Sequence, residues 1–169
     1  MYCELQLEDG APLELEGMAD TTTGACPVYA LAITYNGGLA AHAVKKLDGV
    51  IPSSCVSEAK GSTRVSELVE VARNALITFG RPQLEPSVVG TDNSANLSIA
   101  MGTATPQRAK PDLPIWASLK DRIRRKLVHM TKVGTDAMPV DFMTKWLKGS
   151  TMELQLAYLI NSRHAVWPA

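Results

Sequence analysis

The chain has 169 residues, of which 46% are apolar and 20% are charged. This length suits one domain, and this apolar share is enough to bury a core, so the composition excludes wholesale disorder. Seventeen basic and seventeen acidic residues cancel, which excludes a protein held to nucleic acid by bulk positive charge.

The first part of the chain is typical of strands joined by tight turns. Residues 2–7 and 13–17 alternate between apolar and polar side chains and predict a hairpin, whose second strand runs on to Asp20. Further along, a continuous apolar run indicates a strand buried on both faces, and a glycine-rich turn leads into its neighbour. These elements are a strand over residues 28–35, the turn Asn36-Gly37-Gly38 and a strand over residues 39–47.

A long helix and a strand–helix unit follow. From Glu58 the pattern is helical, with an inward apolar stripe made of Val65, Leu68, Val69, Ala72 and Leu76. Residues 88–92 then read as a short buried strand, and Asn93 opens a helix that ends near Gly102.

The remaining elements complete an α/β pattern. In chain order we predict a helix over residues 115–126, a strand over 127–133, a loop over 134–139, a helix that carries Asp141, a break at Gly149-Ser150 and a last helix over 151–161. This order predicts an α/β fold with a mixed sheet. We expect one domain over residues 1–149, with a C-terminal helix and tail over 150–169 packed on it.

Three carboxylates lie at the ends of predicted elements, where a ligand site can form. Asp20 and Asp92 end strands, and ligands of α/β sheets bind at the carboxyl ends of strands. Glu58 falls on or close to the inward stripe of its helix, where a carboxylate is costly unless it is paired or bound to a metal. Each acid also has an ordinary explanation: a turn residue for Asp20, a solvated first-turn acid for Glu58 and a helix cap for Asp92. With Asp141 they form a candidate site for a hard cation.

The chain has one basic cluster, in the predicted helix over residues 115–126. A solvated helix face is the ordinary explanation of such a charge run. The alternative is contact with the phosphates of a nucleic acid. The candidate residues for such contacts are Arg108, Lys110, Lys120, Arg124 and Arg125.

Several short motifs follow one another in a specific order. They are Leu15-Glu16-Gly17-Met18-Ala19-Asp20, Thr22-Thr23-Gly24, Asn36-Gly37-Gly38, Val44-Lys45-Lys46, the nine residues from Ser53 to Gly61, Asp92-Asn93-Ser94-Ala95, Val133-Gly134-Thr135 and the six residues from Val140 to Lys145. Together with the order of elements, they resemble the ribonuclease H domain of copia-type LTR-retrotransposon polyproteins, over about residues 13–147.

This resemblance implies a ribonuclease H-like fold, with about five strands in a mixed sheet flanked by helices, an extra N-terminal strand and a C-terminal helix. It implies that Asp20, Glu58, Asp92 and Asp141 are catalytic residues and ligands of two Mg²⁺ ions, with Mn²⁺ as an alternative. The implied reaction is hydrolysis of the RNA strand of RNA–DNA hybrids. The implied partners are the hybrid and an upstream reverse transcriptase domain of the same polyprotein.

Some positions depart from the pattern of these domains. Ala59 replaces a tyrosine, and Arg108-Ala109-Lys110-Pro111-Asp112 lacks a histidine. Two other functions therefore stay open. One is a catalytically silent or domesticated scaffold that binds nucleic acid, and the other is a nuclease of the same fold that acts on DNA. The presence of all four acids favours the active enzyme.

The sequence also predicts where the protein is found. No stretch approaches ~18 uninterrupted apolar residues, so no membrane span is expected. The first eight residues have no basic region typical of a signal peptide. Cys3, Cys26 and Cys55 are odd in number and lack Cys-x-x-Cys spacing, which fits reduced thiols. We expect an intracellular protein, in the cytoplasm, a virus-like particle or the nucleus.

Overall fold

The chain folds around a mixed five-stranded sheet. The computed structural model describes residues 14–23, 26–48, 51, 53–106 and 112–160. Within these residues the strands have the order β3-β2-β1-β4-β5. β1 pairs antiparallel with β2 and β2 with β3, whereas β4 is parallel to both β1 and β5. The predicted α/β architecture is confirmed, with β1 (Leu15–Thr21), β2 (Val28–Tyr35), β3 (Gly38–Lys46), β4 (Ser87–Thr91) and β5 (Val128–Lys132).

The turn between β2 and β3 follows the sequence prediction. Asn36 and Gly37 have φ angles of 50° and 74°. Two successive residues with positive φ are typical of a type I′ turn, which asparagine and glycine adopt at little cost. This turn sets the register of the hairpin, in which Tyr35 faces Gly38.

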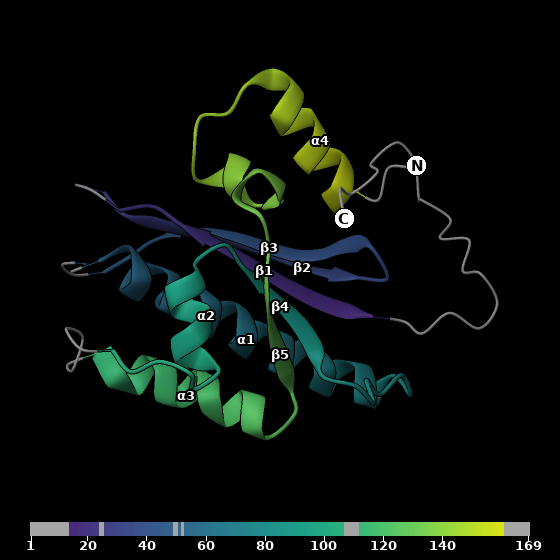
Figure 1. Cartoon of the computed structure of the whole chain (residues 1–169). Helices are drawn as coiled ribbons and strands as arrows, with labels where there is room; N and C mark the ends of the chain where they lie inside the picture. The colour runs from purple at the N-terminus through teal and green to yellow at the C-terminus, as the bar shows by residue number, and fades with distance from the viewer. Residues whose placement is uncertain (1–13, 24–25, 49–50, 52, 107–111, 161–169) are drawn as a thin grey trace.

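Helices cover both faces of the sheet (Figure 1). On one face lie α1 (Ser54–Thr78), α2 (Ser94–Ala100) and α3 (Leu113–Arg124). On the other face lie the short 3-10 helix η3 (Asp141–Met143) and α4 (Gly149–Leu159). The segment that follows β5 therefore crosses to the second face, as the green and yellow part of Figure 1 shows.

Each face of the sheet has its own hydrophobic core. On the first face, Val65 and Val69 of α1 are fully buried, which confirms the predicted inward stripe at these positions. Trp116 and Leu119 of α3 complete this core. The core of the second face comprises Met18, Ala30, Ala32, Met138, Val140 and Leu159. Since Leu159 belongs to it, α4 is packed on the sheet.

Three predicted boundaries were wrong. α1 begins at Ser54, because the side chain of Ser53 accepts a hydrogen bond from the Val56 amide and caps the helix one turn before Glu58. The predicted helix around Asp141 is only the three-residue η3. Gly149 does not break a helix but begins α4, because Lys148 is extended and its carbonyl accepts the amides of the first turn.

Some predictions lie outside the described residues. They are the first strand of the predicted N-terminal hairpin, over residues 2–7, and the basic residues Arg108 and Lys110. Among the helices that the structure describes, none combines the length and the apolar character that a membrane crossing requires.

Candidate active site

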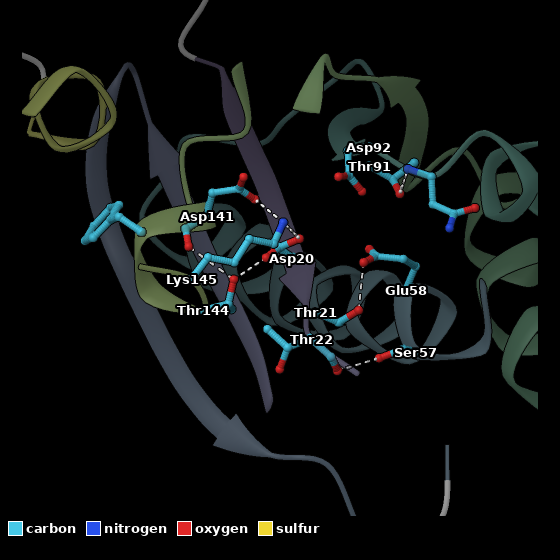
Figure 2. A network of polar contacts seen from close by, with 12 residues as sticks. Asp20, Thr21, Thr22, Ser57, Glu58, Thr91, Asp92, Asp141, Thr144 and Lys145 are labelled. Carbon is cyan, nitrogen blue, oxygen red and sulfur yellow. Dashed lines mark hydrogen bonds and ion pairs between the residues drawn. The ribbon is translucent and has the colours of Figure 1, made fainter. Parts of the chain in front are cut away.

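Three acids meet at the carboxyl ends of two central strands. Asp20 is the second-last residue of β1, Asp92 follows β4 directly, and Glu58 lies in the second turn of α1. One carboxylate oxygen from each of them lies within 4.8 Å of the others (Figure 2). β1 and β4 are parallel neighbours, so their carboxyl ends meet at one edge of the sheet. The structure thus brings together three of the four acids that the sequence singled out.

Asp92 does not cap the helix that follows it, so this expectation was wrong. The cap of α2 is Asn93, whose side-chain oxygen accepts a hydrogen bond of 2.9 Å from the Asn96 amide. The carboxylate of Asp92 has no hydrogen bond among the described residues, and Figure 2 shows it turned toward Glu58. Its side chain is therefore available to a ligand. Its backbone carbonyl accepts a hydrogen bond from Lys132, which fixes the chain at this point.

Glu58 is buried with one oxygen unsatisfied. The residue is 5% exposed. Its Oε1 accepts a hydrogen bond of 2.7 Å from the Thr21 hydroxyl, whereas its Oε2 is buried and has no partner among the described residues. Burial, reinforced by the charges of Asp92 and Asp20 against the opposing effects of Thr21 and Lys145, raises the pKa of Glu58 to about 8. An unsatisfied oxygen beside two further acids costs free energy, which a bound cation would offset.

Asp141 joins the acids through a lysine. Lys145 donates to Asp20 Oδ1 at 3.2 Å and to Asp141 Oδ1 at 3.1 Å. The Thr144 hydroxyl donates to the second oxygen of Asp20. Burial and the charge of Asp20 raise the pKa of Asp141 to about 6, although Lys145 opposes this shift. Burial lowers the pKa of Lys145, but its two acidic partners outweigh this effect and hold the pKa above its ordinary value.

Thr144 and Lys145 were not assigned a role from the sequence. Both close the motif from Val140 to Lys145, and four residues separate Asp141 from Lys145. Such spacing lets side chains meet on a helix, but here the 3-10 helix and the turn after it bring them together. The amides of Thr144 and Lys145 both donate to the Asp141 carbonyl. Their contact with Asp20, on another part of the chain, leaves no local signal.

Solved structures share this architecture. No protein-family model and no curated protein matches the chain. It is similar to the N-terminal RNase H domain of rv2228c from Mycobacterium tuberculosis, solved as a fusion with maltose binding protein, at 11% identity and a TM-score of 0.57, over 85% of this chain and 96% of that chain. The chain has the ribonuclease H fold. LC11-RNase H1, isolated from compost by a metagenomic approach, is similar at 11% identity and a TM-score of 0.59, over 73% of this chain and 86% of that chain.

LC11-RNase H1 has also been solved in complex with an RNA/DNA hybrid. That structure is similar at 10% identity and a TM-score of 0.54, over 74% of this chain and 88% of that chain. At such identities the likeness shows the fold. The ribonuclease H fold of this chain thus has Asp20, Glu58 and Asp92 clustered at one edge of its sheet.

The basic cluster lies away from these acids. Arg122 and Arg125 pair with Glu70 of α1 at 2.9 and 3.0 Å. Glu70 is twelve residues after Glu58, which corresponds to about 18 Å along the helix axis. Arg124 pairs with Asp121. The structure does not bring Lys120, Arg124 or Arg125 to the acid site, and their contact with nucleic acid stays a prediction.

Other cations lie closer to the acid site. A groove of about 880 Å³ runs between β3 and the helices α1 and α3, and its lining includes Lys45, Lys46 and Lys60. Lys45 is aligned with Tyr29 of β2, which is aligned with Thr21 of β1. Two strand spacings, about 10 Å, therefore separate Lys45 from the residue that binds Glu58. Lys45 and Lys46 are exposed, and both belong to a motif that the sequence singled out.

A glycine lets α1 approach β1 closely enough to place Glu58. A Cβ added at Gly61 would lie 2.8 Å from the Thr21 Cγ2 methyl group and 3.4 Å from the Ala19 Cβ. Thr21 can relieve the first contact only by turning, and turning moves the hydroxyl that binds Glu58. A glycine at position 61 is therefore needed to keep Glu58 in place.

We expect Gly61→Ala to weaken Mn²⁺ affinity by about tenfold, the loss typical of residues that orient metal ligands. Isothermal titration calorimetry with Mn²⁺ measures this affinity. The control is Gly149→Ala, because a Cβ added at Gly149 would meet nothing within 4 Å. It should keep the affinity and the melting temperature, or raise the latter slightly. Equal affinities of both variants and the wild type would show that Gly61 does not position Glu58.

Proposed function

We propose that the chain is a Mg²⁺-dependent endonuclease that hydrolyses the RNA strand of RNA–DNA hybrids. One observation carries this proposal. The Oε2 atom of Glu58 is buried and unpartnered among the described residues, in a group where Asp20, Glu58 and Asp92 each offer an oxygen within 4.8 Å of the others. A protein does not keep such an arrangement cheaply without a cation.

The donor set fits a hard divalent cation. Asp20, Glu58 and Asp92 would hold it, because carboxylate oxygens are the protein ligands that Mg²⁺ and Mn²⁺ prefer. When bound, such ions generate hydroxide from water near neutral pH and stabilise the negative charge of a reacting phosphate. We propose two ions for the complete enzyme, with Asp141 beside Asp20 as a ligand of the second.

The remaining residues of the site hold these acids in place. The Thr21 hydroxyl orients Glu58, and the Thr144 hydroxyl orients Asp20. The hydrogen bond from Lys132 to the Asp92 carbonyl fixes the backbone between β4 and α2. These contacts leave the carboxylate of Asp92 as the most exposed of the three ligands, so we place the substrate phosphate on its side.

The proposed substrate is an RNA–DNA hybrid because the same fold has been solved with one, in LC11-RNase H1. A hybrid presents phosphates and 2′-hydroxyl groups along its backbone. We propose that Lys45, Lys46 and Lys60 contact phosphates of a strand that leaves the site along their groove. The net charge of zero means that such contacts must come from a local patch.

The motif resemblance supports an origin in a retrotransposon polyprotein of the copia type. The segments Asp92-Asn93-Ser94-Ala95 and Val140 to Lys145 carry most of this resemblance. An upstream reverse transcriptase domain and an intracellular location are part of the same proposal. Both follow from the origin, and neither follows from the geometry of the site.

Salt dependence tests which cations contact the hybrid. The association constant of the hybrid falls as salt rises, and we expect Lys45→Ala/Lys46→Ala to make this fall less steep. The magnitude of the slope of its logarithm against log salt should decrease by about two, which is roughly one per phosphate contact. Arg124→Ala/Arg125→Ala serves as the comparison, because Asp121 and Glu70 already pair with these arginines. The measurement is hybrid binding in Ca²⁺ from about 50 to 200 mM salt. A change of slope in the arginine variant alone would assign binding to the basic cluster.

A silent scaffold is the second candidate, and Lys145 is the observation that favours it. This ammonium neutralises part of the acidic charge without any bound ion. Cleavage of a labelled RNA–DNA hybrid with Mg²⁺ and with EDTA distinguishes the two candidates. Single-stranded RNA and duplex DNA are the controls, and cleavage of duplex DNA instead of the hybrid would identify a DNA nuclease. Binding without cleavage in Mg²⁺ or Mn²⁺ would support the scaffold.

A further inference from the structure

One cation of this protein is built into the acidic site. The Lys145 ammonium lies 3.2 Å from Asp20 Oδ1 and 3.1 Å from Asp141 Oδ1 (Figure 2). Asp20 is 1% exposed and Asp141 is 5% exposed. Two buried carboxylates close together repel each other unless a positive charge lies between them. Lys145 supplies this charge.

The local fold directs Lys145 into this position. The amides of Thr144 and Lys145 donate to the Asp141 carbonyl, at 3.0 and 2.8 Å. The turn that they close returns the side chain of Lys145 over Asp141. The Thr144 hydroxyl then donates to the remaining oxygen of Asp20, so adjacent residues satisfy both oxygens of Asp20.

The acids therefore form two places of different character. Toward Glu58 and Asp92, the described residues place no cation within ion-pairing distance of either carboxylate, and Glu58 Oε2 lacks a partner. Toward Asp141, an ammonium already bridges the two acids. Asp20 belongs to both places, since one of its oxygens lies within 4.8 Å of Glu58 and Asp92.

We propose that Lys145 occupies the place of the second divalent cation, so that the protein without nucleic acid binds one such ion, at Asp20, Glu58 and Asp92. This inference rests on the proposed function, because it assumes that the acids bind divalent ions. Lys145 is thus a positioning residue that sets how many ions the site holds.

Asp20 and Asp141 could together hold a second ion only after the Lys145 side chain has left them. The side chain of Lys145 is 36% exposed, whereas both its partners are nearly inaccessible. Its flexible stem can turn outward toward water or toward the phosphate of a bound strand. Nucleic acid binding then supplies an anion for Lys145 and frees Asp20 and Asp141 together.

Counting bound Mn²⁺ tests this directly. Electron paramagnetic resonance of free Mn²⁺ gives the number bound per chain, without nucleic acid. We expect one ion in the wild type and two in Lys145→Met, which keeps the length of the stem and removes the charge. The control is Lys148→Met, because Lys148 lies on the same segment and its side chain has no hydrogen bond or ion pair among the described residues. It should bind one ion.

Two further variants separate ion binding from folding. Lys145→Gln keeps a polar end and should also bind two ions. Lys145→Met/Asp141→Asn loses one charge of each sign and should again bind one ion. In EDTA we expect Lys145→Met to melt about 5 °C below the wild type, because it leaves buried carboxylates without a counter-charge. The double variant should recover most of this loss.

Each result has one meaning. Two ions in the wild type, or one ion in both Lys145→Met and Lys145→Gln, overturn the role of Lys145 and leave the proposed nuclease intact. No bound ion in any variant overturns the metal-dependent nuclease itself. One ion in the wild type and two in the lysine variants support the inference.

Discussion

Asp92→Asn is expected to remove most Mg²⁺-dependent cleavage of a hybrid while the fold stays intact. The substitution keeps the size of the side chain and removes one anionic ligand. No hydrogen bond among the described residues is lost, because Asn93 caps α2 and Lys132 contacts only the backbone of Asp92. We expect a loss of activity on the order of 100-fold or more. The melting temperature in EDTA should rise slightly, since one of several repelling charges is gone.

Melting scans with and without about 10 mM Mg²⁺ accompany the cleavage assay. Wild type should gain stability from the ion and Asp92→Asn should gain less, because a ligand stabilises only the state that binds it. Glu85→Gln is the control, since Glu85 is exposed and lies just before β4, at the end of the strand opposite to Asp92. Full activity in Asp92→Asn would show that the Asp92 carboxylate is not a required metal ligand. If the wild type neither cleaves the hybrid nor gains stability from Mg²⁺ or Mn²⁺, the proposal that the protein is a metal-dependent nuclease is wrong.

In EDTA the wild type is expected to lose stability as the pH rises from about 5 to above 8. The pKa of Glu58 rises on folding from an ordinary 4.5 to about 8. Between these values the folded protein keeps a proton that the unfolded chain has released. The stabilisation is complete below pH 4.5, falls progressively as the pH rises, and is fully lost once the pH has passed about 8. It amounts to on the order of 5 kcal/mol, or roughly 10 to 20 °C in melting temperature.

Glu58→Gln should remove most of this decline. Glutamine resembles the protonated acid and still accepts the hydrogen bond from Thr21. Asp141, whose pKa rises to about 6, leaves a smaller decline at lower pH in both proteins. The two melting curves should therefore agree near pH 4.5 and diverge toward pH 8.5, with the variant more stable. Parallel curves across this range would mean that Glu58 is ionised throughout in the folded protein.

Local patterns predicted most of the sheet and its first helix. Strand β2 is an uninterrupted run of apolar and β-branched residues, and Asn36-Gly37 has few alternatives to a tight turn. The inward stripe of α1 follows from the 3.6-residue period, and Val65 and Val69 are buried as expected. These signals lie within a few residues of one another, so they can be read without knowing the fold.

Boundaries after β5 could not be predicted in the same way. The segment from Asp141 to Leu147 has apolar residues at helical spacing, but only Asp141–Met143 is helical. The contacts of Asp20 with Thr144 and Lys145 compete with continuation of the helix. A periodic pattern carries no information about such distant partners.

The candidate site also combines residues that local patterns predicted with contacts that they could not predict. Asp20 and Asp92 could be found because they end predicted strands, and Glu58 because of its place on α1. Which residue caps α2 could not be decided, because Asp92 and Asn93 are adjacent and both suit the role. The salt bridge between Arg125 and Glu70 also could not be predicted from the sequence, since 55 residues separate them.

The order of the chain makes this site a late product of folding. Thr144 and Lys145 contact Asp20 across 124 and 125 residues. Closing so long a loop is entropically costly and slow compared with the formation of local hairpins and helices. On the ribosome, β1 to β5 are synthesised before the segment that neutralises Asp20. The nascent protein can thus have a complete sheet and still lack its organised centre until the last turn docks.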